Sequence, residues 1–387
     1  MFTKLFTKGL CMAACLTGAC IAQRPIFDAY PGLKDKVACV EFADLPTPVM
    51  RLSAIEKTVN NSCELYLKDD GKTGTRYGGN KVRKLEFLLA DALKHGAKAV
   101  VATGGAGSNY TTAVSAYAPL VGLKSIVLLK PQVNVSTLRS NLLLSTYYGA
   151  DIRYFKNGDA RNEAVLQLLD SCRNYYVLGG GSNEIGTIGY VNAAFELKKQ
   201  IDEGLIQEPD YIYVACGSMG TAAGLMLGLK AAGLKTRVVC VPTIPQSFAY
   251  MGTWAKGVAI LYNQTSSFLH DLDEHFCVSD IIESDVIMHD VLFGGGYVTV
   301  DQEEYEAIMM ARELEDIKLE GTYAGKAFAA LMRDIRDGKL NGKKVLFWKT
   351  NSSADYSALT STVNYKDLPQ ELHVYFETDV QPLDVGC

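Results

Sequence analysis

Hydrophobic residues follow two alternating patterns along the chain from about residue 96 onward. Short β-branched runs are typical of strands buried on both faces of a parallel sheet. Longer runs with apolar residues three or four positions apart are typical of helices that cover such a sheet. The alternation predicts an α/β fold with parallel sheets covered by helices. The predicted strands are 99–102, 125–129, 211–216, 237–241 and 344–348, and the predicted helices include 111–120 and 221–232.

A further helix is predicted to begin at Lys81, with Asn80 as its N-cap. Lys81, Arg83 and Lys84 then lie in its first turn, where the helix dipole favours acidic residues. Cations at this end of a helix indicate a functional role. A lysine near other cations and a helix N-terminus has a lowered pKa, and its neutral amine can form a Schiff base. The alternative is a solvated basic turn without function.

Two glycine-rich turns each follow a predicted strand and precede a predicted helix. In the first, residues 103–110, backbone N–H groups and the Ser108 and Asn109 side chains can bind a substrate carboxylate. The second, residues 217–224, lacks the lysine of a nucleotide-binding P-loop and the spacing of a dinucleotide fingerprint. It remains a small Gly/Ser/Thr cup with room for one phosphate group.

Composition narrows the class of protein. The chain has 387 residues, which suggests two or three domains, and a formal net charge of -5. No Lys/Arg block is present, so nucleic-acid binding is not expected. His270, His275 and Cys277 are interpreted as loop residues, and no metal site is expected. The 35 glycines, against 11 prolines, suggest many tight turns between strands and helices.

The first 22 residues have the composition of a targeting segment. Lys4 and Lys8 precede an uncharged stretch that ends at Ala22, as in a secretory signal. A transit peptide or an ordered N-terminal arm are the alternatives. The stretch is too short to span a bilayer, so no integral membrane segment is expected in the mature chain. The location is periplasmic or exported if this is a signal, and otherwise cytoplasmic.

Several motifs, in this order along the chain, resemble the D-cysteine desulfhydrase and 1-aminocyclopropane-1-carboxylate (ACC) deaminase family. These are pyridoxal-phosphate (PLP) enzymes of the tryptophan synthase β-like fold, fold type II, and the resemblance extends from about Arg24 to Thr350. It implies that PLP lies in an interdomain cleft and that the protein is a homodimer. The motifs are 46–48, 78–86, 103–109, 180–183 with Gly186 and 189–190, 217–221, and 323–327.

The resemblance also implies roles for individual residues. Lys81 matches the lysine that holds PLP as a Schiff base, and Asn80 its neighbour at the 3-oxygen of the cofactor. Ser108 matches the serine that faces the substrate, as nucleophile or proton-handling group, with Asn109 at the carboxylate. Tyr297 and Tyr323 match the two tyrosines of the active site. The phosphate cup corresponds to Gly217, Ser218, Met219, Gly220 and Thr221.

Several positions depart from the family pattern. Gly107 and Tyr110 flank the Ser-Asn pair where the family usually has Gln before it and His or Gln after it. Ala324 replaces a Glu of ACC deaminases, or a Thr or Ser of desulfhydrases, beside the pyridine nitrogen. Near the C-terminus, Lys349-Thr350-Asn351-Ser352 replaces a string with His and two glycines. These changes leave room for a different substrate or for reduced activity.

The expected function is that of a PLP-dependent lyase or deaminase acting on a small amino acid, nearest to D-cysteine desulfhydrase. ACC deaminase is the alternative within the enzymes. A different class is an exported amino-acid-binding protein without catalysis, in which Lys81 has no role. The expected domains are a large PLP domain, residues 23–82 and 192–387, and a small α/β domain, residues 83–191, after a possible signal or transit segment, residues 1–22.

Overall fold

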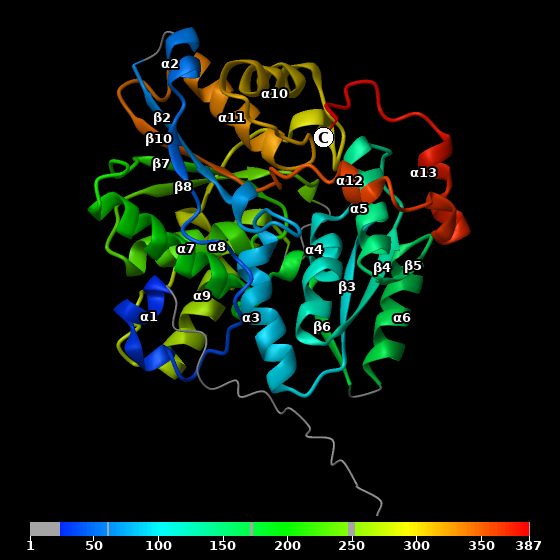
Figure 1. The fold of residues 1–387 in the computed structure, drawn as a ribbon. Coiled ribbons are helices and arrows are strands. Elements are labelled where there is room, and N and C mark those ends of the chain that lie inside the picture. The colour runs from blue at the N-terminus through cyan, green and yellow to red at the C-terminus, as the bar shows by residue number, and fades with distance from the viewer. Residues whose placement is uncertain (1–23, 60–61, 171–172, 247–251, 387) are drawn as a thin grey trace, which may run out of the picture.

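Two sheets form the framework of the protein in the computed structural model, which describes residues 24–59, 62–170, 173–246 and 252–386 (Figure 1). The larger sheet has the strand order β1-β2-β10-β7-β8-β9, and the smaller has the order β5-β4-β3-β6. Only β1 and β2 pair antiparallel among the described strands. The strands are β1 (Val49–Arg51), β2 (Glu64–Asp69), β3 (Ala99–Gly105), β4 (Lys124–Lys130), β5 (Asp151–Tyr154), β6 (Asn174–Val177), β7 (Tyr211–Cys216), β8 (Arg237–Pro242), β9 (Ile287–Met288) and β10 (Lys344–Lys349).

Helices cover both faces of the six-stranded sheet, as Figure 1 shows, with α7, α8 and α9 on one face and α10 and α11 on the other. Alternate residues of β7 divide between the two cores: Ile212 and Val214 pack with α7 and α8, and Tyr213 and Ala215 with α11. The helices are α1 (Pro25–Ala29), α2 (Ser53–Val59), α3 (Lys81–Lys94), α4 (Asn109–Tyr117), α5 (Ser136–Tyr147), α6 (Gly158–Leu169), α7 (Glu184–Asp202), α8 (Gly220–Ala231), α9 (Trp254–Leu272), α10 (Gln302–Glu315), α11 (Ala324–Arg336), α12 (Ser357–Thr360) and α13 (Val374–Glu377).

The four-stranded sheet is covered in the same way. Val100 and Ala102 of β3 join the core beneath α3 and α4, while Val101 faces the other side and packs with Val165 of α6. Both sheets are therefore buried on two faces, which explains the continuous apolar runs of their strands. The predicted α/β architecture is confirmed.

Element boundaries follow the sequence pattern with one informative difference. The predicted strands all occur, and α3 begins at Lys81 as expected. The helix predicted to reach residue 120 ends its α-helical part at Tyr117 and continues as a 3-10 turn, Ala118–Val121. Pro119 lies in that turn, where its missing N–H and fixed φ do not allow the α-helix to continue.

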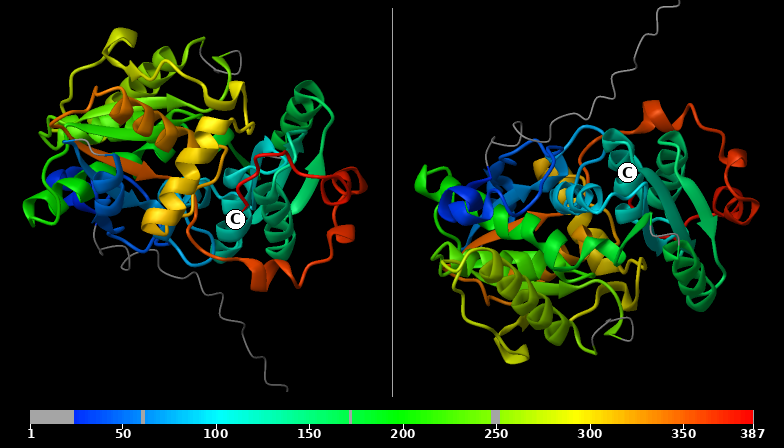
Figure 2. Two further views of the ribbon diagram at one scale, coloured as in Figure 1. Left: turned by 90° about the horizontal axis from the view of Figure 1, so that it is seen from above. Right: turned by 90° about the horizontal axis from the view of Figure 1, so that it is seen from below.

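The C-terminal strap, residues 357–386, has no counterpart in the motifs that the sequence presented. In both views of Figure 2 its red ribbon leaves the large sheet and passes along the four-stranded layer. Asn134 Nδ2 and Arg139 Nε donate to the Tyr375 carbonyl at 2.9 and 2.7 Å. Gln381 contacts a second segment, because its Nε2 donates to the Val298 carbonyl at 3.0 Å. The strap thus connects two segments that are far apart in sequence.

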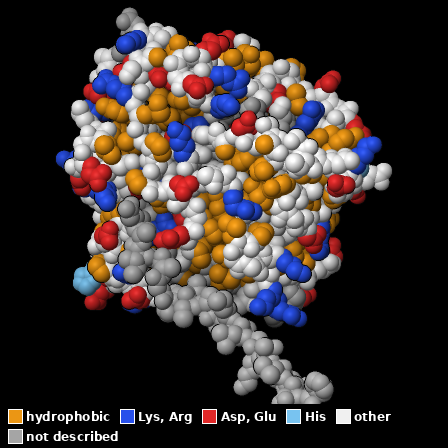
Figure 3. Space-filling view, in the orientation of Figure 1, with side chains coloured by type: hydrophobic (Ala, Val, Ile, Leu, Met, Phe, Trp, Pro, Cys, Tyr) orange, Lys and Arg blue, Asp and Glu red, His pale blue; other side chains and the backbone are white. Residues whose placement is uncertain are grey.

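The outer surface carries both signs of charge. Lys/Arg and Asp/Glu side chains are interspersed on the face in Figure 3, with hydrophobic side chains between them. No helix of the described residues combines the length and apolarity needed to cross a membrane. The expected signal or transit segment, residues 1–22, lies outside the described residues. The domain boundaries near residues 83 and 191 stay a prediction.

Candidate active site

A cavity of about 770 Å³ lies where the carboxyl ends of β3, β4, β7 and β10 face the N-termini of α3, α4 and α8. This is the usual place for a ligand in a parallel α/β protein. The residues that the sequence assigned to the site all line this cavity except Gly220, which adjoins it: Asn80, Lys81, Ser108, Asn109, Gly217, Ser218, Met219, Thr221, Tyr297 and Tyr323.

Lys81 is the first residue of α3, and its amine lies in the cavity. Burial lowers the pKa of Lys81 to about 8, although the negative charge of Glu320 opposes this shift. The predicted direction is confirmed, and its main cause is burial rather than neighbouring cations. An amine with this pKa has a far larger neutral fraction near physiological pH than an ordinary lysine, and the neutral form can act as a nucleophile.

Arg83 shows that the solvated-turn alternative is wrong, because its side chain is only 1% exposed. Its guanidinium donates to both oxygens of Asp70, at 2.8 and 3.1 Å, and to both oxygens of Glu196, each at 2.9 Å. Lys68 also pairs with Glu196, at 2.6 Å. These bonds connect the start of α3 to β2 and α7, and so fix the position from which Lys81 extends.

Lys84 is fully buried in the same turn, and the sequence gave it no role. Its Nζ donates to the Gly180 carbonyl at 3.2 Å and to Ser182 Oγ at 2.9 Å. Burial and the positive charge of Lys81 hold the pKa of Lys84 well below its usual range. Ser182 in turn donates to Ser218 and accepts from the Gly220 N–H. A cation and several small donors therefore converge on the cup at residues 217–221.

Backbone geometry favours an anion in this cup. Met219 has a φ of 68°, and α8 begins at the next residue, so the free N–H groups of its first turn point into the cup. A Cβ on Gly220 would lie 2.7 Å from Ser182 Oγ and 2.8 Å from Lys84 Nζ, so only glycine lets these donors come this close. A buried amine whose bonds are all to neutral groups fits the phosphate of PLP.

Asn80 occupies the position before α3, but its side chain makes no capping bond, so the N-cap prediction is wrong in its detail. Its Nδ2 instead donates to Thr221 Oγ1 at 3.0 Å. The backbone of Asn80 is helical in φ and ψ, whereas a capping side chain requires extended geometry. The side chain is thereby directed toward the phosphate cup and the cavity.

Ser108 caps α4, since its Oγ accepts from the Thr111 N–H at 3.5 Å. An oxygen that accepts at the cap keeps its O–H available to donate toward the cavity. Asn109 Oδ1 accepts from the Tyr77 hydroxyl at 3.0 Å and from Asn141 Nδ2 at 2.8 Å. With its oxygen engaged in this way, Asn109 has its NH₂ left for a ligand. Both residues therefore present donors, which suits a carboxylate.

Gln132 is a cavity residue that no local sequence signal indicated. It follows β4, and its Oε1 accepts from the Gly107 N–H at 3.0 Å. A Cβ on Gly107 would lie 2.7 Å from Gln132 Nε2. Glycine is therefore required at position 107, because the side-chain amide of Gln132 occupies the space that a Cβ would fill. An amide side chain thus lies beside Ser108 after all, contributed by Gln132, 25 positions from Gly107.

Tyr297 and Tyr323 are brought together, with their hydroxyls 2.7 Å apart. Burial raises the pKa of Tyr297 to about 12 and that of Tyr323 well above its usual range. Both hydroxyls therefore keep their protons at neutral pH and can donate hydrogen bonds, although burial makes them weaker acids than an exposed tyrosine. Glu320 lies nearby, but its carboxylate is engaged by the backbone N–H groups of Thr322, Tyr323 and Ala324 at the start of α11.

The end of β10 lies beside the cavity, although residues 349–352 differ from the string that is usual in the family. Asn80 N–H donates to the Thr350 carbonyl at 3.0 Å, and Gly78 N–H donates to Ser352 Oγ at 3.2 Å. Lys349 occupies the position of the family histidine and pairs with Asp69 at 3.2 Å. One backbone bond and one side-chain bond thus support the 78–80 segment from the string where the family has glycines.

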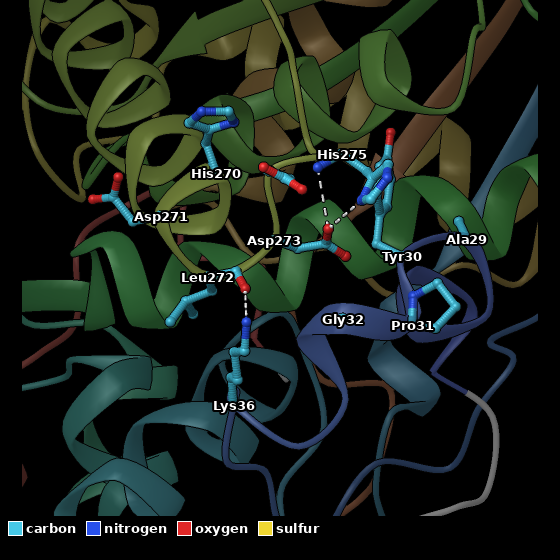
Figure 4. Close-up of a pocket in the computed structure, with 11 residues that line it drawn as sticks. Ala29, Tyr30, Pro31, Gly32, Lys36, His270, Asp271, Leu272, Asp273 and His275 are labelled. Atoms are coloured by element: carbon cyan, nitrogen blue, oxygen red, sulfur yellow. Dashed lines mark hydrogen bonds and ion pairs between the residues drawn. The ribbon is translucent and has the colours of Figure 1, made fainter.

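The histidine cluster near α9 forms no comparable site. Figure 4 shows His275 bonded to Asp273, with His270 apart from both. Lys36 closes the other side of this pocket by donating to the Leu272 carbonyl, as the figure also shows. Among the described residues, no group of three or more His, Cys, Asp or Glu side chains is placed to hold a metal ion.

The fold and this cavity define a class of protein, the PLP-dependent α/β enzymes. The chain belongs to the family described as pyridoxal-phosphate dependent enzymes, which matches residues 40–350. The expected cofactor and the expected enzyme class are confirmed, and a binding protein without catalysis is not favoured.

Two relatives and one solved structure are similar to this chain over most of its length. A putative ACC deaminase from Pyrococcus horikoshii is 31% identical over 85% of this chain and 94% of its own length. A D-cysteine desulfhydrase from Klebsiella pneumoniae is 29% identical over 81% of this chain and 94% of its own length. A crystal structure of an ACC deaminase homologue aligns with a TM-score of 0.70 and 28% identity, covering 91% of this chain and 99% of that one. The similarity to the desulfhydrase and deaminase family is confirmed.

Proposed function

We propose that the protein is a PLP-dependent lyase that converts D-cysteine and water to pyruvate, hydrogen sulfide and ammonia. The observation that carries this proposal is that one cavity holds three features together. These are a lysine with a pKa of about 8, a cup suited to a phosphate group, and two side chains that can donate hydrogen bonds to a substrate carboxylate. PLP, when bound, supplies an electron sink for negative charge at the substrate Cα. Lys81 would hold it covalently, with Asn80 at its 3-oxygen.

The phosphate would be held by backbone N–H groups of residues 217–221 together with Lys84 and Ser182, which the sequence left unassigned. Lys84 is fully buried, and its Nζ donates a hydrogen bond to Ser182 Oγ at 2.9 Å. A dianionic phosphate supplies the negative charge that this buried cation lacks. The cofactor would thus be anchored at both ends, by Lys81 and by the cup.

The substrate would be oriented by Ser108 and Asn109, whose donors can bind its carboxylate at the N-terminus of α4. Lys81 would remove the Cα proton as a neutral amine. The Tyr297–Tyr323 pair would donate a hydrogen bond to the leaving sulfur, because both hydroxyls keep their protons at neutral pH. Ser108 is better suited to donate a hydrogen bond than to act as a nucleophile, since its Oγ accepts at the helix cap.

One observation favours D-cysteine over ACC. Ala324 is completely buried and offers no side-chain polar atom to the pyridine nitrogen, and Glu320 is engaged with backbone N–H groups. The ring would then withdraw electrons less strongly. Expulsion of sulfide, a good leaving group, requires less electron withdrawal than opening a cyclopropane ring. ACC deamination to 2-oxobutanoate and ammonia is therefore the second candidate.

The proposal is tested by assaying the purified protein with D-cysteine, L-cysteine and ACC in parallel. Sulfide and pyruvate are expected from D-cysteine, with little product from the other two. Lys81→Ala should abolish turnover, whereas Lys94→Ala, at the exposed end of the same helix, should not. Turnover of ACC with no sulfide from D-cysteine would favour the deaminase instead.

A homodimer and the two-domain division, 23–82 with 192–387 and 83–191, belong to the same proposal. The family resemblance supports both, and the separate six-stranded and four-stranded sheets support the domain division. Light scattering after size exclusion should give the mass of two chains. A single-chain mass at all concentrations would contradict the dimer.

A further inference from the structure

Lys326 is a buried cation that the proposed chemistry does not use. It belongs to the motif at residues 323–327, which supplies Tyr323 to the cavity. Lys326 is the third residue of α11, and its side chain is completely buried. Taking an ammonium group out of water is costly unless its charge and its N–H groups are satisfied by the protein. The partners of Lys326 therefore indicate its role.

The ammonium group of Lys326 makes three bonds, and two of them go to one loop. Its Nζ donates to the Phe293 carbonyl at 2.7 Å, to the Thr299 carbonyl at 2.6 Å and to Glu304 Oε2 at 2.9 Å. Glu304 lies in α10, is also fully buried and supplies the opposite charge. The two carbonyls are at the two ends of the tyrosine loop, residues 293–299. One side chain thus fastens both ends of this loop to α11.

The tyrosine loop is strained and lies close around the ammonium group. Val298 is buried and has a φ of 74°, which a β-branched residue rarely adopts. Gly294 has a φ of 67°, and a Cβ on it would lie 2.0 Å from the Thr299 carbonyl oxygen and 3.1 Å from Lys326 Nζ. Strained backbone persists only where surrounding contacts hold it. The bonds from Lys326 to both ends of the loop are such contacts.

The same bonds connect the two tyrosines of the cavity. Tyr297 lies in the tyrosine loop, and Tyr323 directly precedes α11, three positions before Lys326. Their hydroxyls are 2.7 Å apart. This distance depends on how the loop is placed relative to α11, which the bonds from Lys326 fix. A shift of about 1 Å along the contact would take the hydroxyls beyond hydrogen-bond range.

We propose that Lys326 is a positioning residue of the active site, which clamps the tyrosine loop to α11 and so sets the contact between the Tyr297 and Tyr323 hydroxyls. The inference rests on the proposed function, in which this pair donates a hydrogen bond to the leaving sulfur. Lys326 is not among the described residues that line the cavity, so it acts through the two tyrosines.

The test separates this clamp from a general contribution to stability. Lys326→Met alone leaves the buried Glu304 uncompensated, which can prevent folding. The neutralised variant, Lys326→Met with Glu304→Gln, removes both charges and all three bonds. It is compared with Glu304→Gln alone, which keeps Lys326 as a donor to the two carbonyls. Arg336→Met is a second control, because it removes an exposed ion pair with Glu303 between the same two helices.

The first measurement follows the two tyrosines without turnover. In the PLP-loaded protein labelled with carbon-13 at tyrosine Cζ, the resonance of each tyrosine reports the hydrogen bonding of its hydroxyl. Tyr297→Phe and Tyr323→Phe assign the two resonances. Both should move in the neutralised variant and stay in place in Glu304→Gln and Arg336→Met. A folded neutralised variant with both resonances at their native positions would overturn the proposal.

The second measurement is a double-mutant cycle on the turnover of D-cysteine. Relative to Glu304→Gln, the neutralised variant should reduce kcat roughly 10–100-fold, because the hydroxyl pair is misplaced. In a Tyr297→Phe background the same change should reduce kcat only about twofold, since the clamp acts through that residue. An equal loss in both backgrounds would show that Lys326 is merely structural. If instead the proposed function is wrong, the native protein produces no sulfide, while the tyrosine resonances still report on the clamp.

Discussion

The three cations in the first turn of α3 lie in three different environments. Lys81 faces the cavity, Arg83 is neutralised by Asp70 and Glu196, and Lys84 lies behind the phosphate cup. The sequence showed that three cations lie at a helix N-terminus, where acidic residues are preferred. It did not show that each of them has a different environment. Their partners lie up to 113 positions away, so no local pattern could show the division.

The pKa of Lys81 predicts how cofactor loading depends on pH. Only the neutral amine forms a Schiff base, so the rate at which PLP reloads the apoprotein should rise about tenfold per pH unit below a midpoint. That midpoint should lie near the lowered pKa of about 8, with a plateau above it. Stopped-flow absorbance would measure the rate. A midpoint near the ordinary lysine value of 10.5 would show that Lys81 is not perturbed.

Gly107 gives a second prediction at the scale of one residue. In Gly107→Ala the new Cβ would lie 2.7 Å from both Gln132 Nε2 and Leu138 Cβ, so the loop before Ser108 must shift. The KM for the amino acid should rise by roughly tenfold while the PLP absorption is retained, because the cup is not touched. Gly158→Ala is the matched control, since nothing lies within 4 Å of its Cβ. An unchanged KM in Gly107→Ala would contradict the role given to Gln132.

Helices and strands could be predicted where the alternation of buried and exposed residues appears within a few neighbouring positions of the sequence. The two-sided burial of β7 and β3 gives the continuous apolar runs that the sequence displays. The C-terminal strap was not predictable, because its elements are short and are held by bonds from distant side chains. Arg139 and Gln381 provide such bonds.

The strap should affect the cavity as well as stability. Gln381 bonds the backbone of Val298 and Val300, next to Tyr297, and its own N–H donates to the Asn134 carbonyl near Gln132. Gln381→Ala removes the two side-chain bonds and should lower the free energy of unfolding by about 1–2 kcal/mol. It should also raise the KM, because the Tyr297 loop is less firmly held. Denaturant unfolding and steady-state kinetics test the two effects, and a KM equal to that of the native protein would show that the strap only stabilises.

The whole molecule is organised by the meeting of two sheets at their carboxyl ends. The sequence indicated this arrangement through glycine-rich turns that follow strands, and much of the glycine excess lies there, at 104–107, 179–181 and 217–220. The buried network that joins the sheet to α3 and α7 was not visible in the sequence. Lys68, Asp70 and Glu196 each look like ordinary surface charges in the sequence, and nothing there links them to Arg83 until the fold brings them together.

This network predicts how stability responds to acid. The positive charges of Arg83 and Lys68 outweigh the effect of burial and lower the pKa of Glu196 to about 2, from an ordinary value of 4.5. Glu196 therefore stabilises the folded state fully above pH 4.5, and this contribution is lost as the pH falls toward 2. Glu196→Gln should cost about 3 kcal/mol of unfolding free energy at neutral pH. The difference from the native protein should shrink across that acidic range, and a constant difference would contradict the network.

The central claim is that Lys81, and not its buried neighbour Lys84, holds PLP. Borohydride reduction of the loaded protein, followed by peptide mass spectrometry, tests this directly because it fixes the cofactor on the lysine that binds it. The expected result is one phosphopyridoxyl group on Lys81 and no label in the Lys81→Ala variant. A label on Lys84, or a native protein that remains colourless and unlabelled, would contradict the account.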